Sequence, residues 1–462
     1  MIEDQIKEIC KKLKPVLGSQ ADQLWLNYLT SENHQSKQEA ASFIQMCAVR
    51  YLSDQVDDGT IYLPPPPREN TYGEIQLGRI YYGTRPMYPL YLTRDNFRKH
   101  MGIFSITGGG KTNVGLNLLL NFLRRNIPFM VIDWKRSYRS ILTLDQPKVK
   151  TVQILTVGRK TSSSFQWNPL RGPPRVHPRT WINVVVETLE KSHISGQGVA
   201  DILIDVLDSQ FEALGVYDGS FEQYPNFFDV ARELVKLKVK GRRMLWHDSS
   251  QRIVRTFTFG PAAGTFNARH PAKLEEFLEK PVIFELDQEL PKPLRVFFSE
   301  IILRWIHLYR LGQGETDELR HVAILEEVHN MFPKSRIEYQ VTNSLENIFR
   351  EIRSFGQGLI TITQHPSLLP IYVLGNCNTQ IYLGLQHEDD IVTAKRALFL
   401  EPRDEVYLDR LKVGEGIVKI KGRIQPCQVR FPHIKIKPGI ITDSMLGGEN
   451  NAETNMDPVR DH

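Results

Sequence analysis

The stretch that decides the fold is Ile103-Phe104-Ser105-Ile106-Thr107-Gly108-Gly109-Gly110-Lys111-Thr112. It begins as an apolar strand, passes through three glycines and enters an amphipathic helix predicted over 111–125. Because glycine has no Cβ, the backbone can turn its N–H groups toward a polyphosphate, and the start of the helix adds unpaired donors. The segment therefore predicts a phosphate-binding loop.

The residue types in this loop indicate ATP as the cofactor, together with Mg²⁺. Lys111 supplies a cation for the β and γ phosphates, and the Thr112 hydroxyl is expected to bind Mg²⁺. The residues expected to hold the cofactor are Gly108, Gly109, Gly110, Lys111, Thr112 and Asn113. Ser105 stands where the usual pattern G-x-x-x-x-G-K-[ST] begins with glycine. Since Gly-Lys-Thr also arises by chance, the assignment depends on the flanking strand and helix.

A second apolar strand, 321–325, ends in the acid pair Glu326-Glu327. Parallel strands present the residues at their carboxyl ends to the edge where α/β sheets bind ligands. There Glu326 is expected to hold Mg²⁺ through water, and Glu327 to orient and polarise the attacking water. The alternative is a pair of acids that begins a surface helix. Gln364 follows the next strand, 359–363, and is expected to sense the γ-phosphate, unless it merely ends that strand.

The whole pattern predicts an α/β fold with a mainly parallel sheet. Expected strands are 102–106, 129–133, 152–157, 282–286, 322–325, 359–363 and 380–385. A helical insertion is expected at about 178–278, and a hairpin of 416–420 with 424–431 closes the core. Pro426 lacks an N–H donor, which predicts that the second hairpin strand lies at a sheet edge.

Other segments flank this core, which is expected over 101–440. Residues 1–68 read as a helical N-terminal region ending in a linker with the stiff run Pro64–Pro67, and 69–100 as a short β element. The polar segment 441–462 is expected to be a disordered tail. No apolar run approaches the length of a membrane span and no hydrophobic signal core is seen, so we expect a soluble cytoplasmic protein.

Several ordered blocks resemble the HerA-like branch of the HerA/FtsK hexameric ATPases over about 75–432. The blocks are His100-Met101-Gly102-Ile103, Asp133-Trp134, Asn168-Pro169-Leu170, Glu326-Glu327-Val328-His329-Asn330, Arg353–Leu359 and Thr363-Gln364-His365-Pro366-Ser367. The resemblance implies a RecA-like P-loop core, a homo-hexameric ring and ATP hydrolysis at subunit interfaces.

A site at a subunit interface needs an arginine from the neighbouring subunit to stabilise charge on the γ-phosphoryl group. Arg353 matches the arginine of the family motif, and Arg350 lies one helical turn away. Either could instead be a surface residue that pairs with Glu346 or Glu351. We expect His329 to support the site by hydrogen bonding rather than to act as a base.

The resemblance also bears on partners. HerA-like translocases usually begin with a β-barrel, whereas the first 60 residues of this chain read as helical. By analogy, a replaced N-terminus resembles bacterial HerA-like ATPases encoded beside effector nucleases or NAD-consuming sirtuin-like proteins in anti-phage defence. The basic run 236–243 would line a pore if it were a strand, while Lys135, Arg136 and Arg139 form a competing basic patch for double-stranded DNA. The net charge is only +5, so DNA contact needs such local patches.

Three functions follow from these expectations. The first is a ring-shaped DNA translocase or helicase-like motor that activates a partner effector. The second is a protein-translocating ATPase of the type IV secretion kind. The third is a scaffold on which a partner oligomerises, with ATP turnover secondary.

Overall fold

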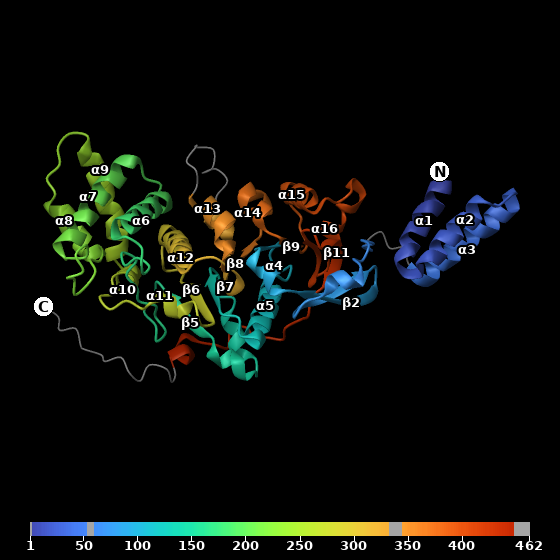
Figure 1. Ribbon diagram of the computed structural model, residues 1–462, viewed down its shortest axis with the longest axis horizontal. Helices are drawn as coiled ribbons and strands as arrows, with labels where there is room; N and C mark the ends of the chain where they lie inside the picture. The colour runs from blue at the N-terminus through green and yellow to red at the C-terminus, as the bar shows by residue number, and fades with distance from the viewer. Residues whose placement is uncertain (1, 53–59, 332–343, 448–462) are drawn as a thin grey trace.

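The computed structural model describes residues 2–52, 60–331 and 344–447 (Figure 1). In these residues one 11-stranded sheet crosses the molecule in the order β2-β1-β11-β10-β9-β3-β8-β7-β4-β6-β5. The strands are β1 (Ile75–Tyr82), β2 (Arg85–Leu92), β3 (Met101–Phe104), β4 (Phe129–Asp133), β5 (Gln153–Val157), β6 (Val282–Leu286), β7 (Thr316–Glu326), β8 (Phe355–Thr363), β9 (Thr379–Tyr382), β10 (Glu415–Ile420) and β11 (Ile424–Arg430). Neighbours from β9 to β5 pair in parallel, which confirms the mainly parallel α/β fold.

Helices cover both faces of the sheet, and further helices lie at both ends of the molecule. The core helices are α4 (Arg94–Arg98), α5 (Lys111–Arg125), α12 (Lys292–Gln313), α13 (Ser344–Glu351), α14 (Ile371–Asn376), α15 (Glu388–Leu398) and α16 (Tyr407–Arg410). The predicted helical insertion is α6 (Pro178–His193), α7 (Gln197–Ala213), α8 (Phe227–Lys236), α9 (Arg243–Thr258), α10 (Pro261–Phe266) and α11 (Leu274–Phe277), between β5 and β6. Figure 1 shows this lobe at one end of the molecule and the N-terminal helices at the other.

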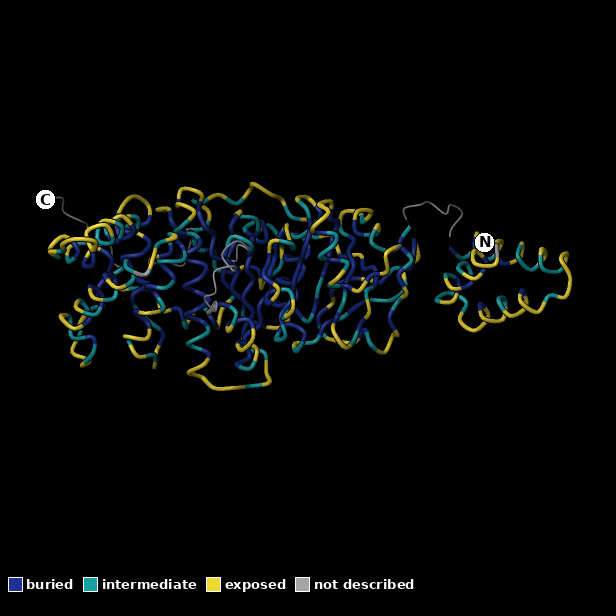
Figure 2. The backbone as a smooth tube through the Cα atoms, turned by 90° about the horizontal axis from the view of Figure 1, so that it is seen from above, coloured by how far each residue is buried: buried dark blue, intermediate teal, exposed yellow. Residues whose placement is uncertain are grey.

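The parallel strands form the buried centre. Every residue of β3, β4, β6 and β8 is buried, as expected of strands covered on both faces. One apolar cluster packs α5 against the sheet through Val114, Leu118 and Phe122. A second cluster packs α12 through Phe297 and Ile301 and continues into the insertion. Figure 2 shows the buried centre flanked by exposed loops.

The N-terminal region is helical, as predicted: α1 (Ile2–Leu17), α2 (Ser19–Leu29) and α3 (His34–Leu52). Its small core contacts the β1–β2 hairpin, because Tyr82 joins the cluster and donates a 2.6 Å hydrogen bond to the carbonyl of Lys12. The hairpin continues the main sheet through β1 and β11, paired at Ile80 and Val429. It is therefore part of the core sheet rather than a separate element before it.

Two local predictions are wrong. Strand β11 pairs with β10 on one side and β1 on the other, so Pro426 does not lie in an edge strand. Its missing N–H is tolerated because the registered pairs with β1 begin only at Gln428, and an irregularity interrupts the pairing with β10 at this point.

The second error concerns the tail. Residues Asp443–Gly447 form a short 3-10 helix (η9) beside β5 instead of disorder (Figure 1). Asp443 anchors it through ion pairs with Arg136 and Arg139. Residues 448–462 lie outside the described part of the chain.

Candidate nucleotide site

The strand order assembles the site. Strand β8 lies between β3 and β7, so three carboxyl ends stand side by side at one edge of the sheet. From β3 the chain enters the glycine loop and α5, from β7 it enters the acid pair, and from β8 it enters Gln364. The three groups singled out from sequence are thereby brought together, although Thr107 of the loop lies 257 residues and Glu327 lies 37 residues from Gln364 in the chain.

The loop has the conformation that phosphate binding requires. Gly108 and Gly110 have φ angles of 79° and 106°, a region that glycine adopts without strain. Helix α5 begins at Lys111, and no side chain caps its N-terminus, so its first-turn N–H groups face the loop. Lys111 Nζ donates to the carbonyls of Ser105 at 2.8 Å and Ile106 at 2.7 Å. Burial lowers the pKa of Lys111 to about 8.

Ser105 explains one glycine of the loop. The Ser105 side chain is buried beneath the loop, and a Cβ on Gly109 would lie 2.1 Å from its Oγ. A Cβ at position 109 would therefore displace the Ser105 hydroxyl, so the serine at position 105 favours glycine at position 109.

Gln364 joins the loop to the acid pair. Its Oε1 accepts a 2.7 Å hydrogen bond from the Thr107 hydroxyl, and its Nε2 donates to Glu327 Oε1 at 2.8 Å. An amide in this position contacts both walls of the space where a γ-phosphate would bind. This geometry arises because β8 separates the other two strands.

Glu327 is held from several sides at the end of β7, with a left-handed φ of 45°. Lys135 forms an ion pair with its Oε1, and His329 lies 3.4 Å from its Oε2. Burial alone would raise the pKa of Glu327, but hydrogen bonds from Lys135 and Gln364 outweigh it and lower the pKa. The carboxylate is therefore ionised, as a group that polarises water must be. His329 also contacts the Thr363 hydroxyl at 2.9 Å, in keeping with a supporting role.

Glu326 has the opposite environment. Its pKa is raised well above the ordinary value by burial and by the neighbouring Asp133 carboxyl, with which it shares a hydrogen bond. Its Oε2 is buried and has no hydrogen-bond partner among the described residues. Without a cation, burial and Asp133 thus favour the protonated form of Glu326. Mg²⁺ beside the Thr112 hydroxyl would favour the carboxylate, which would hold the ion through water, so the two groups fit this ion.

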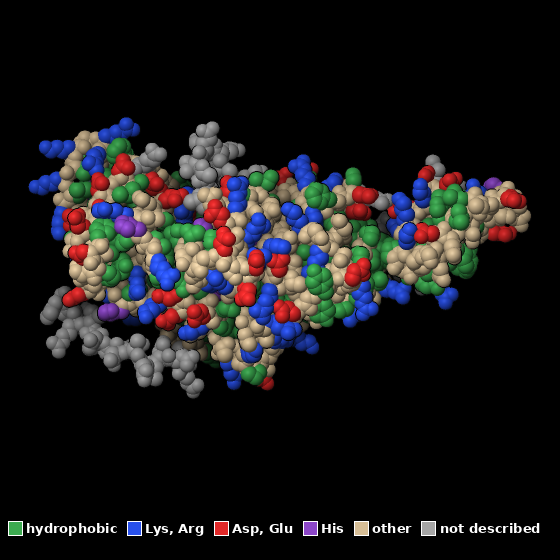
Figure 3. Space-filling view, viewed as in Figure 1, with side chains coloured by type: hydrophobic (Ala, Val, Ile, Leu, Met, Phe, Trp, Pro, Cys, Tyr) green, Lys and Arg blue, Asp and Glu red, His purple; other side chains and the backbone are tan. Residues whose placement is uncertain are grey.

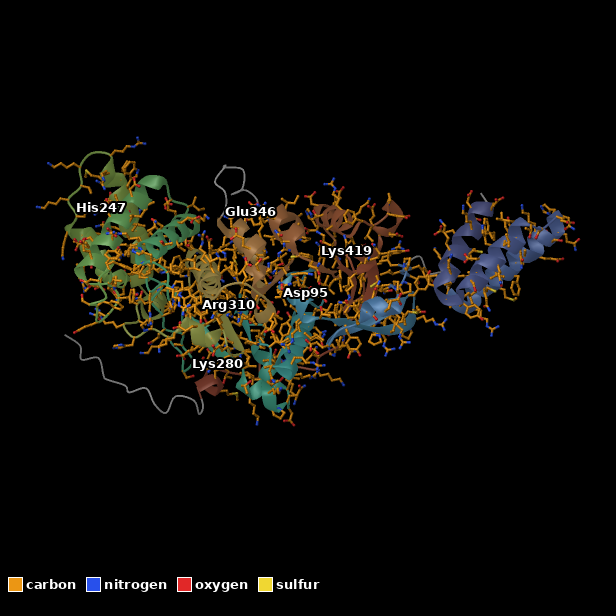
Figure 4. The ribbon with its side chains drawn as sticks, in the orientation of Figure 1. Asp95, His247, Lys280, Arg310, Glu346 and Lys419 are labelled. Atoms are coloured by element: carbon orange, nitrogen blue, oxygen red, sulfur yellow. The ribbon has the colours of Figure 1, made fainter. Side chains whose placement is uncertain are left out.

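The two arginines lie elsewhere. Arg353 precedes β8, so it lies at the amino end of the strand whose carboxyl end leads to Gln364. It is exposed, forms no ion pair among the described residues, and its charge contributes to the lowered pKa of His100 just before β3. Arg350 instead forms an ion pair with Glu346, the surface pairing that was left open above (Figure 4 labels Glu346).

The C-terminal segment crosses the loop side of the sheet. Asn113 Nδ2 donates to the carbonyl of Pro432 at 2.7 Å, and its Oδ1 accepts from Ile434 N at 2.8 Å. The Asn113 amide, expected to contact the cofactor, thus holds this segment in the structure. Further along, Arg136 and Arg139 pair with Asp443, and also with Glu285.

Sequence reasoning missed Asp133, Lys135 and Arg295 as site residues. Lys135, Arg295 and Glu327 line a cavity of about 430 Å³ beside the acid pair, where the Arg295 guanidinium lies over the Trp134 ring. The sequence position of Lys135 could have predicted its place at the site, because it lies two residues after the end of β4, at the edge of the sheet where ligands bind. Because Lys135 pairs with Glu327, and Arg136 and Arg139 with acids, the proposed basic patch is largely neutralised.

The other basic run is a loop rather than a strand or a helix. Helix α8 ends at Lys236, residues 237–242 have no regular structure, and α9 begins at Arg243. The loop lies at the far end of the insertion lobe near His247, where Figure 3 shows protruding Lys and Arg side chains (His247 is labelled in Figure 4).

Comparison with known proteins relates this chain to HerA. Residues 75–212 match the family model described as "Helicase HerA, central domain". A probable DNA double-strand break repair helicase HerA of Methanocaldococcus jannaschii is 24% identical over 372 residues, covering 71% of this chain and 70% of the relative.

Solved structures show the same fold at low identity. The plasmid coupling protein TrwB in complex with ADP and Mg²⁺ superposes with a TM-score of 0.57 at 13% identity, covering 78% of this chain and 94% of TrwB. VirB4 of Thermoanaerobacter pseudethanolicus gives 0.60 at 15% identity, covering 78% and 97%.

The fold and the arrangement of the site define a P-loop ATPase. Within that class, the chain is similar to ATPases of the HerA/FtsK type, because residues 75–212 match the HerA central-domain model and the archaeal HerA relative aligns over 71% of the chain. Among the described residues, no helix combines the length and apolar character needed to cross a membrane.

Proposed function

We propose that this ATPase works as a homo-hexameric ring that moves along double-stranded DNA and activates a partner effector protein. Hydrolysis takes place between subunits: Glu327 orients the attacking water, Gln364 senses the γ-phosphate, and Arg353 of the neighbour completes the site. Mg²⁺ bound by Thr112 and by Glu326 through water would neutralise charge on the phosphates.

The observation that carries the proposal is the separation of Arg353 from its own nucleotide site. Strand β8 has nine residues between Arg353 and Gln364, and at ~3.3 Å per residue it spans roughly 30 Å. Arg353 matches the arginine of the family motif, is exposed and forms no ion pair among the described residues. It is therefore available to a neighbouring molecule. In a head-to-tail arrangement such contacts close into rings.

DNA as the track is supported by the relatives' printed role in double-strand break repair and by the basic loop 236–243. Lys238 and Lys240 in this loop are exposed, and no ion pair involves them in the described structure. Repeated around a ring, the loop would present a circle of cations to the phosphate backbone.

A partner effector is supported by the N-terminal helices. Leu26, Phe43, Met46 and Val49 are each at least 50% exposed on α2 and α3, so an apolar face remains uncovered outside the ring-forming core. The prediction of a nuclease or a sirtuin-like NAD-consuming partner in anti-phage defence is part of this proposal.

The test is ATP turnover of the full chain with and without double-stranded DNA. The proposal expects stimulation by DNA that falls with rising salt and is lost in Lys238→Glu/Lys240→Glu, while turnover without DNA is unchanged. If DNA neither binds nor changes turnover, the protein-translocating alternative gains. If Glu327→Gln stops hydrolysis but leaves activation of the partner intact, the scaffold alternative gains.

A further inference from the structure

A large groove lies between α14, α15 and the turn that joins β10 to β11. Its volume is about 1040 Å³, at the upper end of the ~300–1,000 Å³ typical of ligand sites. Pro64–Pro67 line one wall, and Leu369 and Ala397 are among the apolar residues inside. Two more, Ile371 and Phe399, are 86% and 82% exposed. Concave apolar surface of this extent marks a binding site.

The charge around this α14–α15 groove has one sign. Its cations are Arg396, Lys419, Lys421 and Arg423, and its described lining contains no carboxylate. None of the four forms an ion pair with a described residue. Arg423 is fixed by backbone carbonyls, including that of Asn70 at 2.8 Å. Arg396 and Lys421 are exposed and stand free at the rim.

Lys419 links the apolar and charged parts. Its Nζ donates to the carbonyl of Ala397 at 2.6 Å and lies 3.9 Å from the centre of the Phe399 ring (Lys419 is labelled in Figure 4). Its pKa is lowered by burial and then by Lys421, so no negative group compensates the charge. An anionic occupant would remove this cost.

We propose that the α14–α15 groove binds an acidic amphipathic segment of a partner protein, with large apolar side chains in the groove and carboxylates on the cationic rim. A bilayer surface is excluded by shape, since it cannot enter a concave site. Single-stranded nucleic acid needs several aromatic platforms, whereas Phe399 is the one aromatic ring in the described lining, and the Lys419 ammonium lies against it. This inference stands apart from DNA translocation.

The groove also adjoins the nucleotide site. Pro366 and Ser367 line it and lie two and three residues after Gln364 in the chain. Ser367 N donates to Asp390 Oδ1 at 3.0 Å, and His365 contacts the same carboxylate at 3.0 Å. A bound segment would therefore rest against the residues that hold the end of β8.

The test is selection of a random peptide library on the full chain, with Phe399→Ser used for counter-selection. We expect enriched peptides that combine several large apolar residues with Asp or Glu. Fluorescence anisotropy of labelled peptides should show affinity falling about tenfold or more in Phe399→Ser and in Lys421→Glu. The matched control is Val235→Asp on α8, which is 76% exposed and far from the groove, and should bind normally.

Several results would overturn the proposal. Enrichment of peptides without carboxylates, equal binding to the variants, or no enrichment at all would each do so. If light scattering shows that Phe399→Ser dissociates an oligomer of the unmodified chain, a second copy covers the groove instead. If phosphatidylserine vesicles bind in a way that depends on Phe399 and Lys421, the occupant is a lipid surface. Thermal melts establish that each variant is folded.

Discussion

Mixing two inactive variants should restore ATP hydrolysis if Arg353 acts on the neighbour's nucleotide. Lys111→Ala removes the lysine proposed to contact the phosphates, and Arg353→Ala removes the arginine at the far end of β8. Each variant alone should be nearly inactive, because loss of such an arginine costs about 10³–10⁵ in turnover. The roughly 30 Å spanned by β8 prevents Arg353 from reaching the Lys111 site of its own subunit.

In a mixed ring, however, some interfaces contain an intact Lys111 from one subunit and an intact Arg353 from the next. With equal amounts and random assembly, about one quarter of the interfaces are complete, so turnover should recover to about one quarter of the unmodified level. The assay is steady-state phosphate release after co-refolding or co-expression, with native mass spectrometry to verify that both variants share one ring.

Two controls define the result. The double variant Lys111→Ala/Arg353→Ala should stay nearly inactive when it is mixed with either single variant. In both mixtures one of the two side chains is missing from every subunit, so no interface holds both groups. Arg350→Ala should retain most activity, because Arg350 is paired with Glu346 on the surface. If verified mixed rings of the two single variants remain inactive, Arg353 does not act in trans and the ring-site reasoning fails.

Three further predictions follow from the site and the core. Lys135→Met should lower turnover by about 10²-fold with ATP affinity nearly unchanged, because it removes the ion pair that positions the Glu327 carboxylate. A parallel loss of ATP affinity would contradict this prediction. Gly109→Ala should cost about 1–3 kcal/mol of loop stability and weaken ATP binding, and Ser105→Gly should restore both, because the clash is with Ser105 Oγ; no rescue in the double variant would disprove the contact. His100 is fully buried and its pKa is lowered, by burial and then by Arg353, to about 3. Below its unfolded pKa of ~6.5 only the unfolded chain gains the proton, so stability should fall by about 2 kcal/mol between pH 7 and pH 5, and urea denaturation of His100→Asn should show a correspondingly flatter profile.

Much of the fold was predictable because its signals are local. The glycine loop, the apolar strand before it and helix α5 occupy one continuous stretch, and strand β4 matches its prediction residue for residue. The hydrophobic periods also identified the insertion and the N-terminal helices. Strand ends differed by a few residues; β8, for example, begins four residues earlier than expected.

Other features could not be read from one segment at a time. Pro426 was assigned to an edge because proline lacks an N–H donor for a neighbouring strand. The pairing of its strand with β1 depends on residues over three hundred positions away. Helix η9 is held in place by the ion pairs of Asp443 with Arg136 and Arg139. These partners are distant in the chain, and a short polar segment has no hydrophobic period that would predict them.

The sequence by itself predicted a polyphosphate site with two carboxylates and an amide beside it, because these residue types follow apolar strands directly. Only the tertiary structure decided that β8 lies between β3 and β7, so that Gln364 joins Thr107 to Glu327. The tertiary structure also decided that Lys135 forms an ion pair with Glu327 rather than contributing to a basic surface. The physical reason is that strand order and ion pairing are set by burial and charge neutralisation across the whole chain, not by local propensity.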